Sequence, residues 1–467
     1  MALLIKGGEI VTAESHARGD IYIENETITT IGVDLAAPPL TEVIDATGKL
    51  VFPGFIDPHV HIHLPFMATF AKDTHATASK AALIGGTTTF IEMCCPSRNE
   101  DAMEGYALWK QKAEGNCACD YAFHMAVTRY DAKTEAQLRE IVRDGTASFK
   151  IFLAYKNFFG VNDEEMFSTL KLAAELGVIT TAHCENAELV GQLQQLLLAE
   201  GKFGPEWHEP SRPEGVEAEG TSRFATFLEQ TAAMGYVVHL SCAPALRAAV
   251  EAKLRGVKLY IESVLPHFLL DKSYAERPGV EGMKHVMSPP LREKRNQAVL
   301  WSALQAGLID TVGTDHCPFD AEQKLLGAKA FTQIPNGIPG IEDRVNLMYT
   351  YGVKRGALDI HRFVDALSTR PAKLFGLFPR KGTIAVGADA DLVVYDMNYR
   401  GIVSAATQHT NNDYNGFEGF RIEGRPSVVT VRGKVQVRDG AFVGEPGRGR
   451  MLRREPQYKA AGGNYAG

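Results

Sequence analysis

The chain has 467 residues, of which 45% are hydrophobic and 22% are charged, and its formal net charge is −7. This length and composition are typical of a globular protein that buries one large core together with a smaller domain. The acidic balance provides no basic face for a nucleic acid, and no apolar run approaches the roughly 18 residues of a membrane span. We therefore expect neither nucleic acid nor a membrane as a partner.

The N-terminal sequence MALLIKGGEIV resembles a strand and lacks the basic segment, apolar core and cleavage site of a signal peptide. The chain has seven cysteines, an odd number, and neither Cys94-Cys95 nor the Cys117 and Cys119 pair has the spacing of a zinc knuckle or redox motif. These features predict reduced thiols and a cytoplasmic location.

Short strands are expected at both ends of the chain. Residues 3–31 and 43–50 have strand-like sequence with turns at Gly7-Gly8 and Asn25, and two segments after Gly376 are similar, GTIAVGADADLVVYD and VVTVRGKVQVRDG. Neither end alone has enough strands to bury the face of a sheet. We therefore expect the N- and C-terminal segments to pair into one small β-sandwich domain.

Between these ends, short β-rich apolar runs alternate with amphipathic stretches, which is typical of repeated βα units. For example, Asn162 and Glu165 resemble a capping box, and the apolar spacing that follows predicts a helix that ends at Gly177. Residues 292–306, closed by Gly307, have a similar pattern. The predicted strands are 51–56, 87–93, 121–126, 148–152, 179–183, 237–240, 259–263 and 311–315. Eight such units predict an α/β fold with a closed, TIM-like (β/α)8 barrel.

The predicted boundaries are 1–50 and 376–440 for the two parts of the β-sandwich domain, 51–375 for the barrel and 441–467 for a C-terminal tail. The tail is rich in Gly, Arg and Pro. We expect it either to be disordered or to lie over a neighbouring subunit. Its arginines are then solvated or paired across a subunit interface. They are Arg448, Arg450, Arg453 and Arg454.

The first predicted barrel strand leads into His59-Val60-His61. Side chains alternate along a strand, so both imidazoles face the same side and form half of a site for a divalent metal. An isolated pair of histidines at this spacing would be equally typical of a polar strand end. However, other candidate ligands also follow apolar runs, namely Lys150, His183, His239 and Asp315. The candidates then fall at the carboxyl ends of five strands, the end at which such barrels carry their chemistry.

Four histidines and one aspartate exceed the ligand set of one tetrahedral zinc with an open position, but they fit two metals that share a bridge. Lys150 would repel both cations as an ammonium. If burial lowers its pKa, the neutral amine can add carbon dioxide and become a carbamate with two oxygens. Spacing alone favours the alternative, in which the Lys150 side chain extends to solvent.

Seven motifs together resemble the dihydropyrimidinase and hydantoinase branch of the cyclic amidohydrolases, and the resemblance covers nearly the whole chain. They are PGFIDPHVHIHLPF, SFKIFLAYK, AHCEN, VHLSC, MSPPLR, GTDHCPF and IPNGIPGIEDR.

The resemblance implies two divalent metal ions, usually Zn²⁺, bridged by N6-carboxylated Lys150. One metal is then held by His59, His61 and Asp315, and the other by His183 and His239. A metal-bridging hydroxide is the implied nucleophile, and Asp315 the implied proton carrier to the departing ring nitrogen.

The resemblance also implies substrate contacts. The Tyr155 hydroxyl is expected to bind the developing oxyanion, and backbone groups of Ser288 and Asn336 are expected to bind the ring. Without the resemblance, Tyr155 would be a packed loop aromatic and the other two segments would be Pro-rich turns.

The implied activity is opening of the cyclic amide of 5,6-dihydrouracil, dihydrothymine or 5-substituted hydantoins to N-carbamoyl amino acids, by a homotetramer. The alternative within this class is an allantoinase or another cyclic imide or ureide hydrolase. An alternative of another class is a silent homologue, because the collapsin response mediator proteins share this fold and act by interaction. Those proteins have lost metal ligands, whereas all six ligand positions are filled here.

His63 departs from the patterns of related enzymes. Dihydroorotases place an arginine at this position, hydantoinases usually an aspartate, and allantoinases an asparagine or similar residue. His63 argues against dihydroorotate and leaves the substrate range open. We expect it to lie in a loop or behind the ligands. His316 is expected to orient a ligand. No role is expected for six further histidines, which are His16, His75, His208, His285, His361 and His409.

Overall fold

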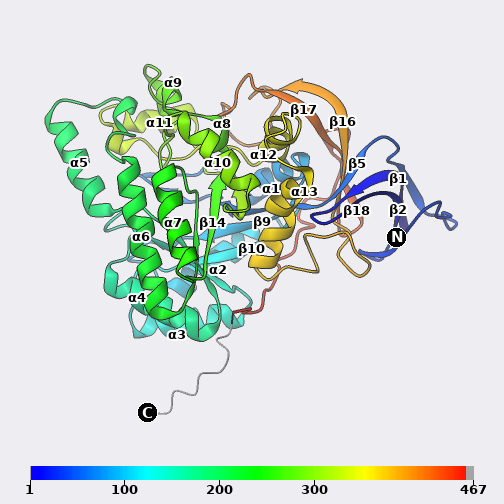
Figure 1. Ribbon diagram of the computed structural model, residues 1–467, viewed down its shortest axis with the longest axis horizontal. Coiled ribbons are helices and arrows are strands. Elements are labelled where there is room, and N and C mark those ends of the chain that lie inside the picture. The colour runs from blue at the N-terminus through cyan, green and yellow to red at the C-terminus, as the bar shows by residue number, and fades with distance from the viewer. Residues whose placement is uncertain (1, 459–467) are drawn as a thin grey trace, which may run out of the picture.

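The computed structural model of the protein describes residues 2–458. Eight parallel strands in the order β15-β14-β13-β12-β11-β10-β9-β6 form the wall of a barrel, and helices cover its outside (Figure 1). The barrel closes where the His61 N–H donates to the His316 carbonyl at 2.8 Å and the Asp315 N–H to the His59 carbonyl at 3.0 Å. The predicted (β/α)8 barrel is therefore confirmed.

The strands of the barrel are short and almost completely buried. They are β6 (Phe55–Val60), β9 (Thr87–Cys94), β10 (Asp120–Ala126), β11 (Ser148–Phe152), β12 (Ile179–His183), β13 (Met234–Val237), β14 (Leu259–Val264) and β15 (Thr311–Gly313).

Most of the helices follow these strands and bury one face against them. They are α1 (His75–Ile84), α2 (Ala102–Ala113), α3 (Ala132–Arg143), α4 (Asp163–Leu176), α5 (Ala187–Ala199), α6 (Glu214–Thr231), α7 (Ala243–Leu254), α8 (Leu265–Leu269), α9 (Val280–Met283), α10 (Arg295–Gln305), α11 (Ala321–Lys324), α12 (Arg344–Met348), α13 (Ile360–Val364) and α14 (Arg370–Leu374). None of these described helices is long and apolar enough to cross a membrane.

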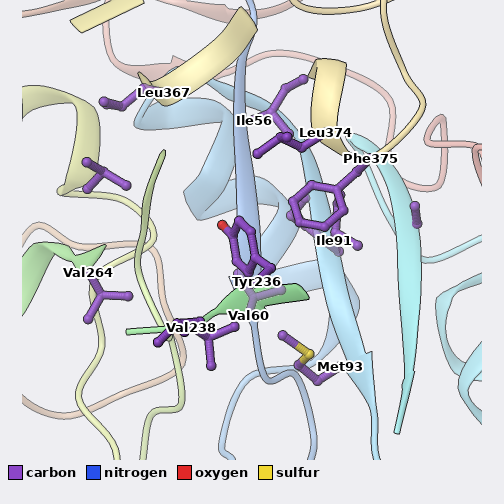
Figure 2. Packing of buried hydrophobic residues seen from close by; sticks show 14 of the residues in the cluster. Ile56, Val60, Ile91, Met93, Tyr236, Val238, Val264, Leu367, Leu374 and Phe375 are labelled. Carbon is purple, nitrogen blue, oxygen red and sulfur yellow. The ribbon is translucent and has the colours of Figure 1, made fainter. Parts of the chain in front are cut away.

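One continuous apolar core fills the barrel and reaches out to its helices. Figure 2 shows part of it, with Ile56 of β6, Ile91 of β9, Tyr236 of β13 and Val264 of β14. The Tyr236 ring packs against Phe375 at 5.2 Å between centroids. Both side chains are fully buried or nearly so, which makes this end of the barrel a packed core rather than a pore.

The two ends of the chain pair into one nine-stranded sheet beside the barrel (Figure 1). β5 and β16 join the two ends by antiparallel pairing. The expected β-domain built from both termini is confirmed. Its strands are β1 (Ala2–Val11), β2 (His16–Glu24), β3 (Thr27–Gly32), β4 (Glu42–Asp45), β5 (Leu50–Pro53), β16 (Leu392–Ile402), β17 (Arg421–Val431), β18 (Lys434–Arg438) and β19 (Ala441–Phe442).

Some predicted elements were wrong in detail. The single strand predicted over 51–56 is two strands in two sheets, β5 and β6, separated by Gly54. A Cβ on Gly54 would lie 2.1 Å from Thr88 Oγ1 and 2.9 Å from Asp391 Cβ, so only glycine fits at this junction. Gly7-Gly8 is not a turn but the place where the register between β1 and β2 shifts.

The strand predicted over 237–240 lies earlier in the chain, since β13 ends at Val237 and the next three residues lie beyond its carboxyl end. The helix predicted over 292–306 begins only at Arg295. Arg292 instead donates to Ser241 Oγ at 2.9 Å and to Glu217 Oε2 at 2.8 Å, outside the helix. The capping box of α4 and its end at Gly177, with φ 71°, are confirmed.

The described part of the C-terminal tail lies along its own barrel. The Leu452 N–H donates to the Tyr121 carbonyl at 2.7 Å, and Arg454, only 1% exposed, donates to Ser148 Oγ at 2.9 Å. Arg450 and Arg453 form ion pairs with Glu26 and Asp144 of the same chain. The subunit contact predicted for the tail, residues 441–467, stays a prediction, and residues 459–467 lie outside the described part of the chain.

Candidate active site

The six candidate ligands lie together at the carboxyl end of the barrel. His59 is in β6 and His61 directly follows it, Lys150 is in β11 and His183 ends β12. His239 and Asp315 each come two residues after a strand, β13 and β15. A single pocket is lined by five of them, namely His61, Lys150, His183, His239 and Asp315.

Two of these residues have a backbone conformation that side chains other than glycine rarely adopt. His239 has φ 42° and Asp315 has φ 53°. Such strain persists only where the surrounding structure imposes it, and it is concentrated at functional sites. Here it turns both side chains out of their strand direction and into the pocket.

His59, His61 and Asp315 form one compact group of donor atoms. Asp315 Oδ1 lies 3.1 Å from Nε2 of His59 and 3.1 Å from Nε2 of His61. One donor atom from each residue falls within 4.8 Å of the others. This group of two imidazoles and one carboxylate can hold one divalent metal.

His183 and His239 form a second group. Nδ1 of His183 and Nε2 of His239 lie 2.9 Å apart. Two bare ring nitrogens at this distance would repel each other through their lone pairs. Either one nitrogen carries a proton or a cation accepts both lone pairs, which suits a second metal.

Carboxylates behind the histidines determine which ring nitrogen faces the pocket. Glu262 Oε1 lies 2.7 Å from Nδ1 of His59, and Glu185 Oε2 lies 2.7 Å from Nε2 of His183. Arg212 in turn donates to Glu185 at 2.6 Å. Each carboxylate accepts the ring proton, so the other nitrogen presents its lone pair, as in carboxylate–histidine–metal arrangements.

Lys150 is completely buried, and its Nζ has no hydrogen-bond partner among the described residues. Burial lowers the pKa of Lys150 to about 8. A larger share of its amine is therefore neutral than in an exposed lysine. Buried Nε2 of His59, which faces Asp315, also lacks a hydrogen-bond partner among residues 2–458. Such buried unpaired donors and acceptors fit residues that bind metal.

Burial also lowers the pKa of three of the ligand histidines, His61 (to about 4), His183 and His239. These rings are neutral near pH 7, which is the form that binds metal. For His59, burial acts in the same direction, but the carboxylates of Glu262 and Asp315 outweigh it and raise the pKa to about 9.

Tyr155 lies in the loop after β11 and lines the same pocket. It has φ 58°, and its carbonyl accepts from the N–H groups of Phe158, Phe159 and Gly160 at 3.0 to 3.1 Å. This tight turn fixes the ring over the pocket, 5.2 Å from the His183 ring. Burial raises the pKa of the Tyr155 hydroxyl, so it keeps its proton and can donate a hydrogen bond.

Ser288 and Asn336 also line the pocket, and the structure joins them directly. Asn336 Nδ2 donates to Ser288 Oγ at 2.9 Å. His63 does not line this pocket; it is half-buried in the following loop, 5.0 Å from the Phe70 ring.

Sequence reasoning missed several residues around the site. Glu262 carried a signal, since it is a charged residue within an apolar strand, and Glu185 lies two residues after a candidate ligand. His208 was expected to have no role, but its Nε2 lies 2.8 Å from the Met287 carbonyl and 3.3 Å from Ser288 Oγ. Nothing in its local sequence signals these contacts.

His316 lies where the sequence indicated, behind Asp315. Its Nε2 lies 2.8 Å from Asp73 Oδ2, and its Nδ1 accepts from the Gly340 N–H at 3.1 Å. The ring therefore ties the segment that carries Asp315 to two other loops.

Comparisons with known proteins agree with this geometry. The family model described as "Amidohydrolase family" matches residues 50–435. The chain is 44% identical to the D-hydantoinase of Geobacillus stearothermophilus, over 97% of each chain. It is 37% identical to the dihydropyrimidinase of Rattus norvegicus, over 97% of this chain and 89% of that one.

Solved structures give the same result. A D-hydantoinase (dihydropyrimidinase) from Thermus sp. is 78% identical, with a TM-score of 0.97 over 98% of this chain and 100% of that one. A dihydropyrimidinase from Brevibacillus agri is 44% identical, with a TM-score of 0.96. The match covers both the barrel and the sheet of the two chain ends. The chain belongs to the amidohydrolase family, in the branch of the D-hydantoinases and dihydropyrimidinases.

Proposed function

We propose that this protein is a metal-dependent hydrolase that opens the cyclic amide of dihydropyrimidines or 5-substituted hydantoins to N-carbamoyl amino acids. The observation that carries the proposal is the pocket in which His61, Lys150, His183, His239 and Asp315 face Tyr155. The names of its relatives support the same substrate class.

We infer that the site holds two divalent metals, most simply Zn²⁺, with His59, His61 and Asp315 on one and His183 and His239 on the other. Lys150, carboxylated on its Nζ, would bridge them. Imidazole and carboxylate donors suit zinc, and the unpartnered Lys150 amine is the group that carbon dioxide would modify. When bound, such metals lower the pKa of water and polarise a carbonyl.

Asp315 is the proton carrier of the proposed reaction. Its carboxylate lies at the centre of the histidine group, buried on every side but the pocket. It would take the proton of the attacking water and deliver it to the ring nitrogen as the amide bond breaks. One residue then serves as base in the first step and as acid in the second.

Tyr155 would stabilise the transition state. Its protonated hydroxyl lies over the pocket and can donate to the oxygen that becomes negative as the carbonyl is attacked. Ser288 and Asn336 would bind the ring through their backbone N–H and C=O groups. Leu64, Phe66, Phe152 and Phe159 give the rest of the pocket an apolar wall, which suits a carbon substituent on the ring.

We further propose that the protein is a homotetramer. Helix α5 buries only Val190, while Leu189 and Leu196 on it are 45% and 59% exposed. Helices with this much exposed apolar surface commonly lie in subunit interfaces. Light scattering after gel filtration should give roughly four times the 51.0 kDa of one chain; a mass of one chain would exclude the tetramer.

The activity is tested with a panel of rings offered to the purified protein: 5,6-dihydrouracil, hydantoin, a 5-substituted hydantoin and allantoin. We expect N-carbamoyl amino acids from the first three. Turnover of allantoin alone would instead assign the protein to the allantoinases. No turnover by fully metallated protein would remove all four rings from its substrate range.

A further inference from the structure

Lys324 is a second buried lysine near the site, and it has no part in the mechanism above. It ends helix α11 and is completely buried. Its Nζ donates to the carbonyls of Val286 at 3.0 Å, Pro335 at 2.7 Å and Gly337 at 2.8 Å. An ammonium has three protons, so every donor of Lys324 is used, and each on a backbone carbonyl.

No carboxylate among residues 2–458 forms a salt bridge with this amine, and burial lowers its pKa to about 7. A buried cation without a counter-ion is unfavourable, because the loss of hydration is not repaid by a neighbouring anion. The three carbonyl dipoles compensate it, together with the Phe319 ring, whose centroid lies 5.7 Å from Nζ. A lysine at this buried position therefore requires an explanation.

The three carbonyls belong to the two segments that carry Ser288 and Asn336. Val286 lies two residues before Ser288, and Pro335 and Gly337 flank Asn336 on both sides. The segments are also bonded to each other, because the Gly337 N–H donates to the Val286 carbonyl at 2.9 Å. Lys324 is thus the point at which the two segments meet.

The bonds to Lys324 leave the pocket-facing groups free. Within residues 2–458, neither Ser288 nor Asn336 uses its backbone N–H or C=O in a hydrogen bond. Several neighbouring carbonyls, by contrast, are fixed: Lys324 holds those of Val286, Pro335 and Gly337, while His208 holds that of Met287 at 2.8 Å. Both free pairs belong to residues that line the pocket.

We infer that Lys324 is a positioning residue for substrate binding, which draws three carbonyls to one point and thereby presents the backbone groups of Ser288 and Asn336 to the substrate ring. This inference rests on the proposed function. Lys324 does not line the pocket in which the reaction takes place. We therefore expect its loss to weaken binding of the ring rather than to slow the chemical step.

The test compares Lys324→Met with Lys253→Met as a matched control. Lys253 also donates to a backbone carbonyl, that of Leu308 at 3.2 Å, and pairs with Asp310 at 2.8 Å, but on the outside of the barrel. We expect Lys324→Met to raise KM for 5,6-dihydrouracil about tenfold or more while kcat stays within about threefold, since uniform binding is lost. Zinc content should not change, and Lys253→Met should behave as the parent protein.

Hydrogen–deuterium exchange gives a readout that needs no activity. In Lys324→Met, peptides that cover residues 285–291 and 334–340 should exchange faster, and in Lys253→Met they should not. An unchanged KM together with unchanged exchange would overturn the proposal. If the parent protein opens no ring, the proposed function is wrong, and the exchange result alone decides the role of Lys324.

Lys324→Gln covers the case in which the methionine variant does not fold. Its amide keeps two donors for the three carbonyls. KM and the hydrogen exchange rates should therefore lie between the parent values and those expected when all three hydrogen bonds are lost. If neither variant folds, Lys324 holds the fold rather than the substrate-facing segments, and the proposal is wrong.

Discussion

Glu262 lies 2.7 Å from Nδ1 of His59, although 203 residues separate the two in the chain. Both side chains are completely buried. The same carboxylate accepts from the His239 N–H at 3.0 Å and from the Tyr236 hydroxyl at 2.9 Å. Glu262 therefore connects the two groups of candidate metal ligands, since His59 belongs to one group and His239 to the other.

Glu262→Gln should weaken metal binding. An amide can offer its NH₂ group to Nδ1 of His59, which favours the wrong ring tautomer, and loss of such a partner typically lowers metal affinity about 10- to 100-fold. Competition with a chelator measures the change. Glu229→Gln, at an exposed position paired with Arg255, is the control. Equal metal affinity in both variants would remove Glu262 from this role.

Asp315→Asn should keep the fold and abolish most turnover. An amide cannot accept and release a proton, and loss of a general base typically lowers the rate by about 10² to 10⁴. Circular dichroism and kcat on 5,6-dihydrouracil test both parts, with Asp34→Asn on the exposed surface as the control. A near-normal rate would show that another group carries the proton.

Lys150→Ala should lose the bridge between the metals and with it the activity. A short carboxylic acid such as propionate should restore part of the rate, because its two oxygens replace those of the carbamate. Metal content and kcat are measured with and without the acid. Full activity of the variant without any acid would contradict the bridging role.

Lys381→Met should destabilise the protein without touching the site. Lys381 is buried between Asp120 at 2.7 Å, Asp391 at 2.6 Å and Asp389 at 3.0 Å. Removing one partner of a buried ion pair typically costs about 3 to 5 kcal/mol. The midpoint of thermal unfolding should fall, while KM of the residual folded protein should not change. An unchanged midpoint would show that the cluster contributes no stability.

The same cluster predicts a pH dependence. Burial alone would lower the pKa of Lys381, but the carboxylates of Asp391, Asp120 and Asp389 outweigh it and raise the pKa above its ordinary value. The stabilisation is therefore fully present below the pKa of an unfolded lysine and is lost as the pH rises above it. The stability difference between the parent and Lys381→Met should shrink only in alkaline solution.

Much of the barrel and its ligands could be predicted from the sequence, because each depends on local pattern. Apolar runs predicted strands such as β11 and β12, and a polar residue at the end of a run, such as His183, marked the carboxyl end of the barrel. The sequence did not predict that the strand over 51–56 is divided into two at Gly54. The contacts that require glycine there come from Thr88 and Asp391, which are distant in the chain.

The residues that orient the site were harder to predict. His208 contacts a backbone carbonyl that lies 79 residues away in the chain. Lys324 donates to backbone carbonyls that lie 11 to 38 residues away. No spacing rule connects a side chain with a carbonyl at such distances. Only the closed barrel brings these segments together, so their roles follow from the fold and not from the motif in which each residue occurs.

The most direct test of the two-metal site is a titration of metal-free protein with Zn²⁺ in the presence of bicarbonate, with the rate of 5,6-dihydrouracil opening measured at each step. The account predicts that activity rises until about two metals are bound per chain, the number that a bridged site holds. Full activity at one metal per chain, or in the metal-free protein, would contradict it.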